Sequence, residues 1–129
     1  MHSIGRTALA LLTAFSTSAL AAPISLSCRS EYEKEGEQKT ETKYFYIDVE
    51  DKEMLLSAKK EKWKVLEDFK ADKVSVTGTF FLGYRDIYTV YTINRVTLEL
   101  NSTLYMFKKE NQLAPAKCEI SKFDIDTKF

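Results

Sequence analysis

The sequence predicts an all-β fold, an antiparallel meander of about seven or eight strands that forms a small barrel or sandwich tied by one disulfide. Short runs rich in β-branched and aromatic residues alternate with charged turns along most of the chain. No repeat and no Pro/Gly-rich linker divides these runs, and the two cysteines stand near the ends of the pattern. These observations indicate a single β-rich domain over residues 22–129.

The first two runs show the two-residue period of half-buried strands. In ISLSCRSEY, Leu26 and Cys28 fall on the same face. In KYFYIDV, Phe45 and Ile47 share one face and tyrosines occupy the other. Between these runs, residues 33–43 are polar on every face, so we expect a hairpin tip or a solvated loop there.

The segment around residues 53–70 permits two interpretations. Strong helix formers dominate it, and Trp63, Leu66 and Phe69 recur at roughly helical spacing, which gives an α+β alternative with a helix around 53–70. Interpreted as strands, it forms two runs joined by a Lys-rich turn. We favour strands, because the flanking runs are all strands and need partners in the sheet.

The longest predicted strand is YTVYTINRVTLEL, residues 88–100. Either one face is continuous and Asn94 is an inward polar group, or the apolar residues change phase by one position at Asn94, as a β-bulge inside a continuous strand would produce; we favour the bulge. A bulge would aim Arg95 at a carboxylate across the sheet or at a barrel mouth, either as a binding residue or in a structural ion pair. Further strands are expected at 73–81, 102–109 and 117–123.

The first 21 residues have the form of a secretory signal peptide. Arg6 precedes a short apolar run, and Ala19 and Ala21 occupy the small-residue positions of an Ala-x-Ala cleavage site. This run and every later one is shorter than the roughly 20 residues that a membrane-spanning helix needs. We therefore expect a periplasmic or secreted protein with no membrane span.

Both cysteines, Cys28 and Cys118, lie beyond the expected signal peptide. In an oxidising compartment a lone pair of this kind forms one structural disulfide. A redox-active thiol is the alternative, and the absence of a Cys-x-x-Cys pair disfavours it.

Charge and histidine content exclude several functions. The 19 basic and 19 acidic residues balance, which favours neither nucleic acid nor an anionic membrane as a partner. The one histidine, His2, lies in the expected signal peptide, so His-dependent nucleophilic catalysis and His-ligated zinc are excluded from the mature chain. We expect a protein that is not an enzyme and holds no cofactor and no metal.

Two groups of carboxylates remain as candidates for acid–base catalysis or for binding a hard metal ion. Asp48 and Asp51 lie in DVEDKE, where carboxylates and turn carbonyls would suit Ca²⁺, but the spacing does not match an EF-hand and indicates a solvated turn. Asp124 and Asp126 would point the same way in a strand, and we interpret them as part of an edge-strand tail.

A lysine-rich segment, AKKEKWKVL, surrounds Trp63. Such a mixture would suit an anionic surface or a polysaccharide. Nearby acidic residues dilute the charge, and we interpret the segment as solvated lysines around one buried Trp.

Tyrosines supply the candidate binding surface. Tyr84, Tyr88 and Tyr91 fall on or beside predicted strands, close in the chain to Arg95. Tyrosines bind proteins and glycans at low entropic cost, and they also cover sheet margins with the ring inward and the hydroxyl outward. We predict that Tyr84, Tyr88, Tyr91 and Arg95 are binding residues. The structural alternative is that the tyrosines cover the margins of the sheet.

Three short motifs carry a resemblance to a known group of proteins. They are FYID at Phe45 to Asp48, INRVT at Ile93 to Thr97, and the late pair Lys117 and Cys118. This order resembles small exported bacterial β-rich proteins of uncharacterised function, in which Gly stands where this chain has Leu98 and Ala116. The resemblance implies a β-rich fold and no activity. The two-cysteine layout is also similar to that of periplasmic lysozyme inhibitors, although their Ser-Gly-x-x-Tyr motif is not found.

These observations lead to three functional hypotheses. The first is a non-enzymatic protein- or glycan-binding or inhibitor-like module that uses loops or a Tyr-bearing face to contact an envelope protein or glycan. The second is a small-ligand carrier with an apolar cavity inside the barrel. The third, a hydrolase with paired carboxylates, ranks last because no motif supports it.

Overall fold

The computed structural model describes residues 23–122, so the expected signal peptide, residues 1–21, lies outside the described residues. Within the described range the chain forms ten strands and no helix, which confirms the all-β prediction and shows that the helix considered around 53–70 is wrong. The strands are β1 (Ile24–Lys34), β2 (Glu37–Asp48), β3 (Glu53–Ser57), β4 (Lys64–Val65), β5 (Glu67–Ala71), β6 (Ser75–Phe81), β7 (Ile87–Asn94), β8 (Glu99–Met106), β9 (Lys109–Gln112) and β10 (Ala116–Ile120).

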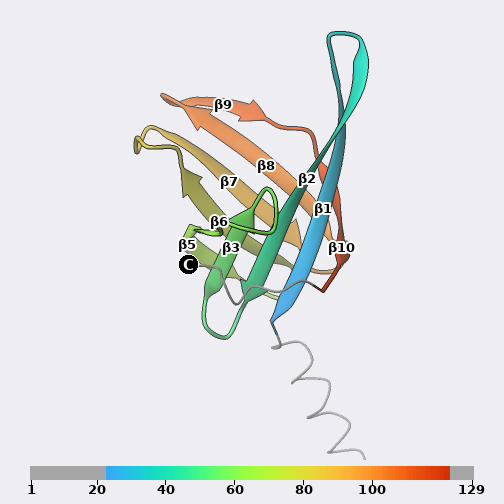
Figure 1. Cartoon of the computed structure of the whole chain (residues 1–129). Helices are drawn as coiled ribbons and strands as arrows, with labels where there is room; N and C mark the ends of the chain where they lie inside the picture. The colour runs from blue at the N-terminus through green and yellow to red at the C-terminus, as the bar shows by residue number, and fades with distance from the viewer. Residues whose placement is uncertain (1–22, 123–129) are drawn as a thin grey trace, which may run out of the picture.

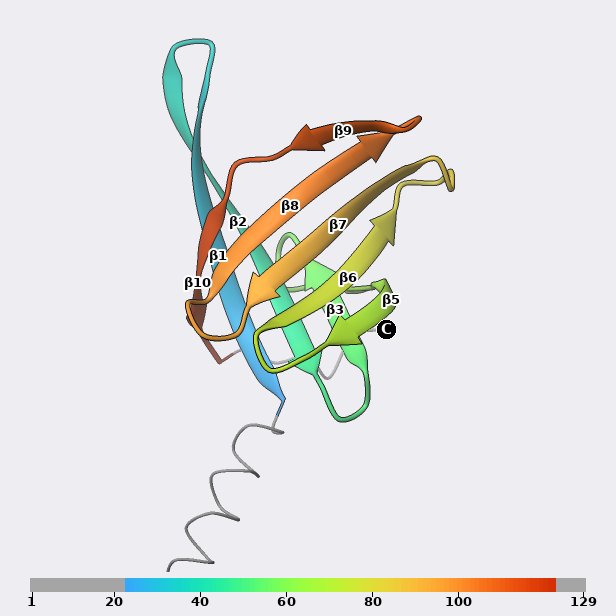
Figure 2. The same cartoon turned by 180° about the vertical axis from the view of Figure 1, so that it is seen from behind.

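All ten strands belong to one antiparallel sheet. Its order is β4-β3-β2-β1-β10-β8-β7-β6-β5, and β9 pairs with β8 beside this path. Most neighbours in the sheet are also neighbours in the chain, as expected for a meander. Figures 1 and 2 show the sheet rolled up into a nearly closed barrel, in which β1 lies beside β10.

The count of ten exceeds the expected seven or eight because one predicted run is divided into β4 and β5 and because a further strand, β9, forms where a loop was expected. β4 pairs with β3 and β5 pairs with β6, and a single residue, Leu66, separates β4 from β5. The Leu66 N–H donates a 2.9 Å hydrogen bond to the Met54 carbonyl on β3. The chain therefore still contacts β3 at the residue after which it pairs with β6. β9 and β10 pair with successive parts of β8, and residues 113–115 connect them.

The core follows the alternation that the sequence shows. Leu26 and Cys28 on β1 are buried, as are Phe45 and Ile47 on β2, and all four face inward as predicted. The ring of Phe45 meets the ring of Tyr91 edge to face, with centroids 5.6 Å apart. Other strands and the residue between β4 and β5 complete the core with Met54, Leu56, Leu66, Val76, Ile93 and Leu100.

The polar segment 33–43 is mostly strand, not loop. β1 and β2 pair continuously from Ile24 to Lys34, and only Glu35 and Gly36 form the tip. Their φ angles, 55° and 80°, are both positive, as a two-residue type I′ hairpin turn requires. This end of the hairpin projects beyond the rest of the barrel (Figure 1).

The predicted disulfide is confirmed. Cys28 on β1 and Cys118 on β10 lie directly opposite one another in the sheet and are bonded, across a sequence separation of 90 residues. The bond therefore joins the first and last strands at the seam where the barrel closes.

Loss of the disulfide should lower stability strongly. By the chain-entropy model, a closed loop of this length contributes about 4 to 5 kcal/mol, which is comparable to the whole stability of many small domains. We expect a Cys28→Ala, Cys118→Ala double variant to unfold at a much lower guanidinium concentration than the oxidised parent. The reduced parent serves as the control and should match the variant, whereas equal midpoints for the variant and the oxidised parent would contradict the prediction.

A close approach inside the barrel explains Gly78 on β6. A Cβ atom at this position would lie 2.7 Å from the Sδ of Met54 and 3.0 Å from the Cβ of Leu66. The Met54 side chain can move, but the Cβ of Leu66 is fixed by its own backbone between β4 and β5, which is hydrogen-bonded to β3. Glycine therefore lets the β4–β5 crossing pack against β6.

We accordingly expect Gly78→Ala to destabilise the protein by about 1 to 3 kcal/mol, the usual range for overpacking a core. Urea unfolding measures this loss, and the same substitution in a Met54→Ala background should cost less because part of the crowding is removed. A Gly78→Ala variant at least as stable as its parent would show that Leu66 can move away from an added Cβ without loss of packing.

Candidate functional site

The meander places its turns alternately at two ends of the barrel. The upper end in Figure 1 holds the β1–β2 tip and the connections 58–63, 82–86 and 107–108. The lower end holds the connections 49–52, 72–74 and 95–98. Inward side chains near the lower end are large and apolar, whereas those near the upper end include polar and charged groups.

A cavity of about 740 Å³ lies at the upper end, and we call it the upper cavity. Its apolar wall comes from inward positions of β3, β6 and β7 and from the residue that follows β6: Leu56, Phe80, Tyr91 and Leu82. Lysines supply most of its charge: Lys43, Lys59, Lys62 and Lys64. The site thus combines an apolar body with a basic margin.

Tyr91 is part of this wall rather than of the outer surface. Only 5% of the residue is exposed, and its register partner on β6 is Gly78. Burial raises the pKa of the Tyr91 hydroxyl, and a hydrogen bond with the Thr89 side chain opposes that rise. Tyr91 is therefore a neutral phenol inside the barrel at physiological pH.

Two lysines enter the cavity from strands. Lys43 follows the same inward alternation as Phe45 and Ile47 on β2, and its side chain forms an ion pair with Glu41. Burial lowers the pKa of Lys43, because the charged form is partly desolvated. Lys64 on β4 pairs with Leu56, and its Nζ lies 5.8 Å from the centre of the Phe80 ring.

The other two lysines belong to the β3–β4 connection, which Ser57 holds in place. The buried Ser57 hydroxyl accepts hydrogen bonds from the N–H groups of Lys59 and Glu61, at 3.2 and 3.0 Å. It also donates to the Glu61 carbonyl at 2.5 Å. The lysine-rich segment singled out in the sequence is therefore an ordered rim of the cavity, and Trp63 is buried beneath it with 6% exposure.

A second, smaller cavity of about 390 Å³ adjoins the first. Glu41 and Lys43 line both cavities, so this ion pair stands at their boundary. The smaller cavity lies where β1 and β9 diverge above the seam, and its polar lining includes Ser30, Ser102 and Gln112.

Tyr88 lies on the outer face of the barrel in a row of rings. Phe81, Tyr88 and Tyr105 are register partners on β6, β7 and β8. Tyr88 stacks on Tyr105 with centroids 4.9 Å apart and meets Phe81 at 5.3 Å. The guanidinium of Arg85 covers the Phe81 ring at 3.8 Å. Because the ring faces pack against one another, this row stabilises the sheet as cross-strand pairs do.

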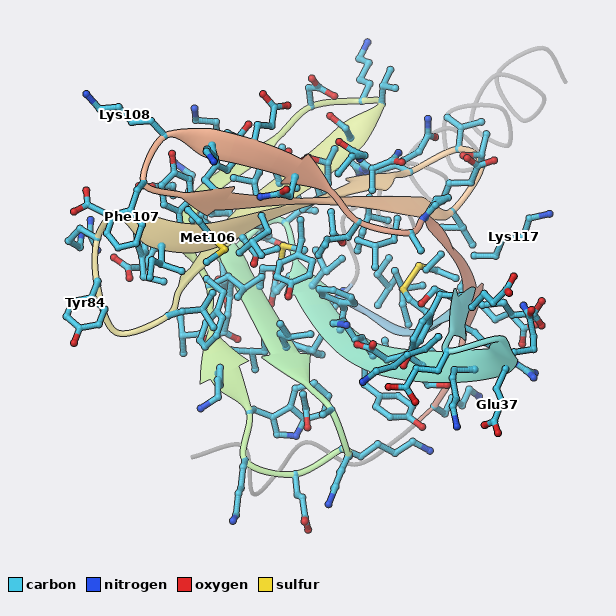
Figure 3. All side chains as sticks on the ribbon, turned by 90° about the horizontal axis from the view of Figure 1, so that it is seen from above. Glu37, Tyr84, Met106, Phe107, Lys108 and Lys117 are labelled. Atoms are coloured by element: carbon cyan, nitrogen blue, oxygen red, sulfur yellow. A yellow bond between two sulfur atoms is a disulfide. The ribbon has the colours of Figure 1, made fainter. Side chains whose placement is uncertain are left out.

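Tyr84 is separate from Tyr88 and Tyr91. It lies in the 82–86 connection and is 70% exposed. Figure 3, which views the upper end from above, places Tyr84 on the same side of the barrel as Met106, Phe107 and Lys108, with Glu37 on the other side. The two connections are joined by a 3.0 Å hydrogen bond from the Phe107 N–H to the Asp86 carbonyl.

The bulge predicted at Asn94 and Arg95 is wrong, because β7 ends at Asn94 and a turn follows. The Asn94 side-chain oxygen accepts hydrogen bonds from the N–H groups of Val96 and Thr97, at 2.8 and 2.9 Å. This Asx turn explains the phase change, since residues before and after it belong to different strands. The four predicted binding residues are therefore not brought together. Tyr84 lies in a loop and Tyr88 on the outer face, whereas Tyr91 lies in the interior and Arg95 at the lower end.

Arg95 joins two turns of the lower end. Its N–H donates to the Val74 carbonyl at 2.7 Å, and its guanidinium donates to the Asp72 carbonyl. Asp72 in turn accepts hydrogen bonds through Oδ1 from the N–H groups of Val74 and Ser75, each at 2.8 Å. Arg95 thus has a structural role in this geometry, far from the upper cavity.

The carboxylate candidates are also accounted for where the structure describes them. Asp48 accepts a 3.0 Å hydrogen bond from the Asp51 N–H, as in an ordinary Asx turn. Residues 23–122 contain no group of three potential metal-ligating side chains. The same range contains no helix long and apolar enough to cross a membrane. Asp124 and Asp126 lie outside the described residues.

Acid should weaken the lower end through Asp72. Hydrogen bonds from the backbone of Ser75 and Val74, together with the charge of Arg95, hold the pKa of Asp72 below its usual value of 3.8. A carboxylate with a lowered folded-state pKa contributes stability that is complete above its unfolded pKa and is lost as the pH falls through the folded value.

We therefore expect Asp72→Asn to reduce the loss of stability below about pH 4, because the amide keeps an acceptor oxygen but does not titrate. Urea unfolding at acid and neutral pH measures the difference. Asp72→Ala is the control and should be less stable at both pH values. An unchanged acid response in Asp72→Asn would contradict the role of this carboxylate.

Comparison with protein-family models, with curated proteins and with solved structures found no match. The resemblance to small exported β-rich proteins therefore stays a prediction, and the functional argument depends on the geometry of the described residues.

Proposed function

We propose that this protein is a non-enzymatic binding protein that holds a small ligand with an apolar body in its upper cavity. The upper cavity itself carries the proposal. Its volume of about 740 Å³ lies within the range of about 300 to 1,000 Å³ that is typical of small-molecule sites. Its walls are strands of a cross-linked barrel, so the site exists before the ligand arrives.

The same geometry favours a cavity ligand over a tyrosine-bearing contact surface. A contact surface needs several anchors that converge on one patch. Tyr88 packs against other rings, Tyr91 faces the interior, and Arg95 joins turns at the opposite end. The small-ligand hypothesis uses Tyr91 as a wall and a hydrogen-bond donor, which suits a buried phenol.

We propose further that the protein acts outside the cytoplasm. The disulfide supports an oxidising compartment such as the periplasm, where the expected signal peptide would deliver the chain. A carrier or sensor of an apolar molecule fits that setting, because such molecules need protection from water between membranes.

The neutral amphiphile 1-decanol tests the cavity directly. We expect it to shift the methyl resonances of Leu56 and Leu82, which line the upper cavity, in NMR spectra of the protein. The methyls of Val74 and Val96, both exposed at the lower end, should not move. The proposed function predicts this pattern because apolar chains are transferred from water to the apolar wall.

A matched pair of variants provides the control. Ala58 is an exposed residue on the margin of the cavity, and Ala58→Trp should narrow it and weaken decanol binding by about tenfold. Val96→Trp places the same side chain at the lower end and should bind like the parent. Absent shifts at Leu56 and Leu82, or equal shifts at both ends, would refute a ligand site in the upper cavity.

A further inference from the structure

The charges of the upper cavity lie on one side. Lys43 and Lys64 enter from β2 and β4, and Lys59 and Lys62 border the cavity from the β3–β4 connection. The opposite wall, from β6, β7 and the residue after β6, presents uncharged side chains: Phe80, Leu82, Thr89 and Tyr91. A ligand that fits this division is charged at one end and apolar along its length.

We propose that the natural ligand is a single-chain amphiphile with an anionic head, held with its chain along the Phe80 and Leu82 wall and its head among the lysines. This inference rests on the proposed function, because it assigns a ligand class to the same cavity. The shared head-group chemistry is that of a carboxylate or a phosphate monoester.

The sign of the charge follows from the side chains that line the cavity. The cavity is lined by four lysines and two glutamates, Glu41 and Glu61; the Lys43–Glu41 ion pair balances one charge of each sign, which leaves three lysines against Glu61. The net positive margin favours an anion. Lysine also suits an amphiphile, because its four-carbon stem packs along an alkyl chain while its ammonium reaches the head. The Lys64 ammonium lies 5.8 Å from the centre of the Phe80 ring, so a positive charge stands beside the apolar wall.

The position of the head follows from the boundary between the two cavities. Lys43 lines both, with the largely apolar upper cavity on one side and the smaller cavity with Ser30, Ser102 and Gln112 on the other. An anionic head at Lys43 would have hydroxyl and amide groups nearby, and the alkyl chain would extend into the upper cavity. The partial burial of the Lys43 side chain, which is 28% exposed, strengthens its attraction for an anion.

The backbone of the β3–β4 connection, which carries the rim lysines, is also arranged in advance. Three hydrogen bonds of the Ser57 hydroxyl fix the path of residues 57–61. An ordered rim loses less conformational entropy on binding than a mobile one, so its charges contribute more to affinity. The segment that the sequence suggested for an anionic surface thus serves a single anionic head.

Three ligands with the same ten-carbon chain test the head group: decanoate, 1-decanol and decylamine. Titrations followed by the Leu56 and Leu82 methyl resonances give the three affinities. We expect decanoate to bind at least about tenfold more tightly than decanol, and decylamine to bind more weakly than decanol. The advantage of decanoate should shrink as salt is added, because ions screen its attraction to the lysines. Decyl phosphate, as a fourth ligand, distinguishes a phosphate head from a carboxylate.

Lysine variants locate the head. Lys43→Met should remove most of the advantage of decanoate and leave decanol binding nearly unchanged, whereas Lys43→Arg should preserve the advantage. The double variant Lys59→Met, Lys62→Met alters only exposed residues, so it tests the rim even if Lys43→Met is unstable. Lys73→Met, in the lower-end turn between β5 and β6, is the matched control and should behave like the parent.

The outcomes separate this inference from the proposed function. If none of the ligands binds in the upper cavity, both are overturned. If decanol and decanoate bind equally and the lysine variants change neither, the anionic head is overturned and the ligand site stands. Tightest binding of decylamine would likewise overturn the anionic head, because it would assign the dominant role to Glu41 and Glu61.

Discussion

Closure of the barrel depends on the short seam between its first and last strands. β1 pairs with β10 only from Leu26 to Arg29, and the disulfide between Cys28 and Cys118 lies within this stretch. So few pairs would be a weak closure for a small domain, and the covalent bond holds the two strands in register. Above the seam β1 continues toward the tip while β9 follows β8, and the smaller cavity occupies the space between them. The same seam therefore closes the lower barrel and leaves the upper barrel open.

A change in side-chain character along each wall accompanies this opening and gives the upper cavity its mixed lining. On β2 the inward positions run from Ile47 and Phe45 at the lower end to Lys43 and Glu41 at the upper end. Across the barrel, β7 changes from the buried Ile93 and Tyr91 to Thr89. Large side chains pack around Gly78 and fill the lower half, whereas at the upper end lysines and threonines stand beside Phe80 and Tyr91 and a hollow remains. The hollow is thus a consequence of composition along the strands and needs no separate domain or lid.

The sequence was sufficient for the fold class and for much of the core, because alternation in the first two strands is a local property. It was insufficient where two strands meet: the phase change at Asn94 indicated a bulge within one strand, whereas the pairing of β7 with β8 shows a turn between two strands. Tyr91 shares its parity with Ile93, and Lys43 shares its parity with Phe45, so a signal for inward residues was present in both cases. An apolar cavity inside the barrel was one hypothesis from the sequence, but its position and lining could not be predicted, since they depend on how β2, β3, β6 and β7 are placed around it, which no local pattern specifies.

The upper cavity is also unfavourable for stability, and this bears on its function. Hollow space forfeits packing contacts, and a partly buried ion pair such as Lys43 with Glu41 contributes little net stability compared with apolar residues of similar volume. A domain of this size has a small margin of stability and depends on a disulfide for part of it. A barrel selected for stability alone would continue the apolar alternation of β2 upward and fill the space. Charged side chains at inward positions beside a hollow therefore agree with the proposed ligand, because a bound chain would supply the missing packing contacts and an anionic head would face the lysines.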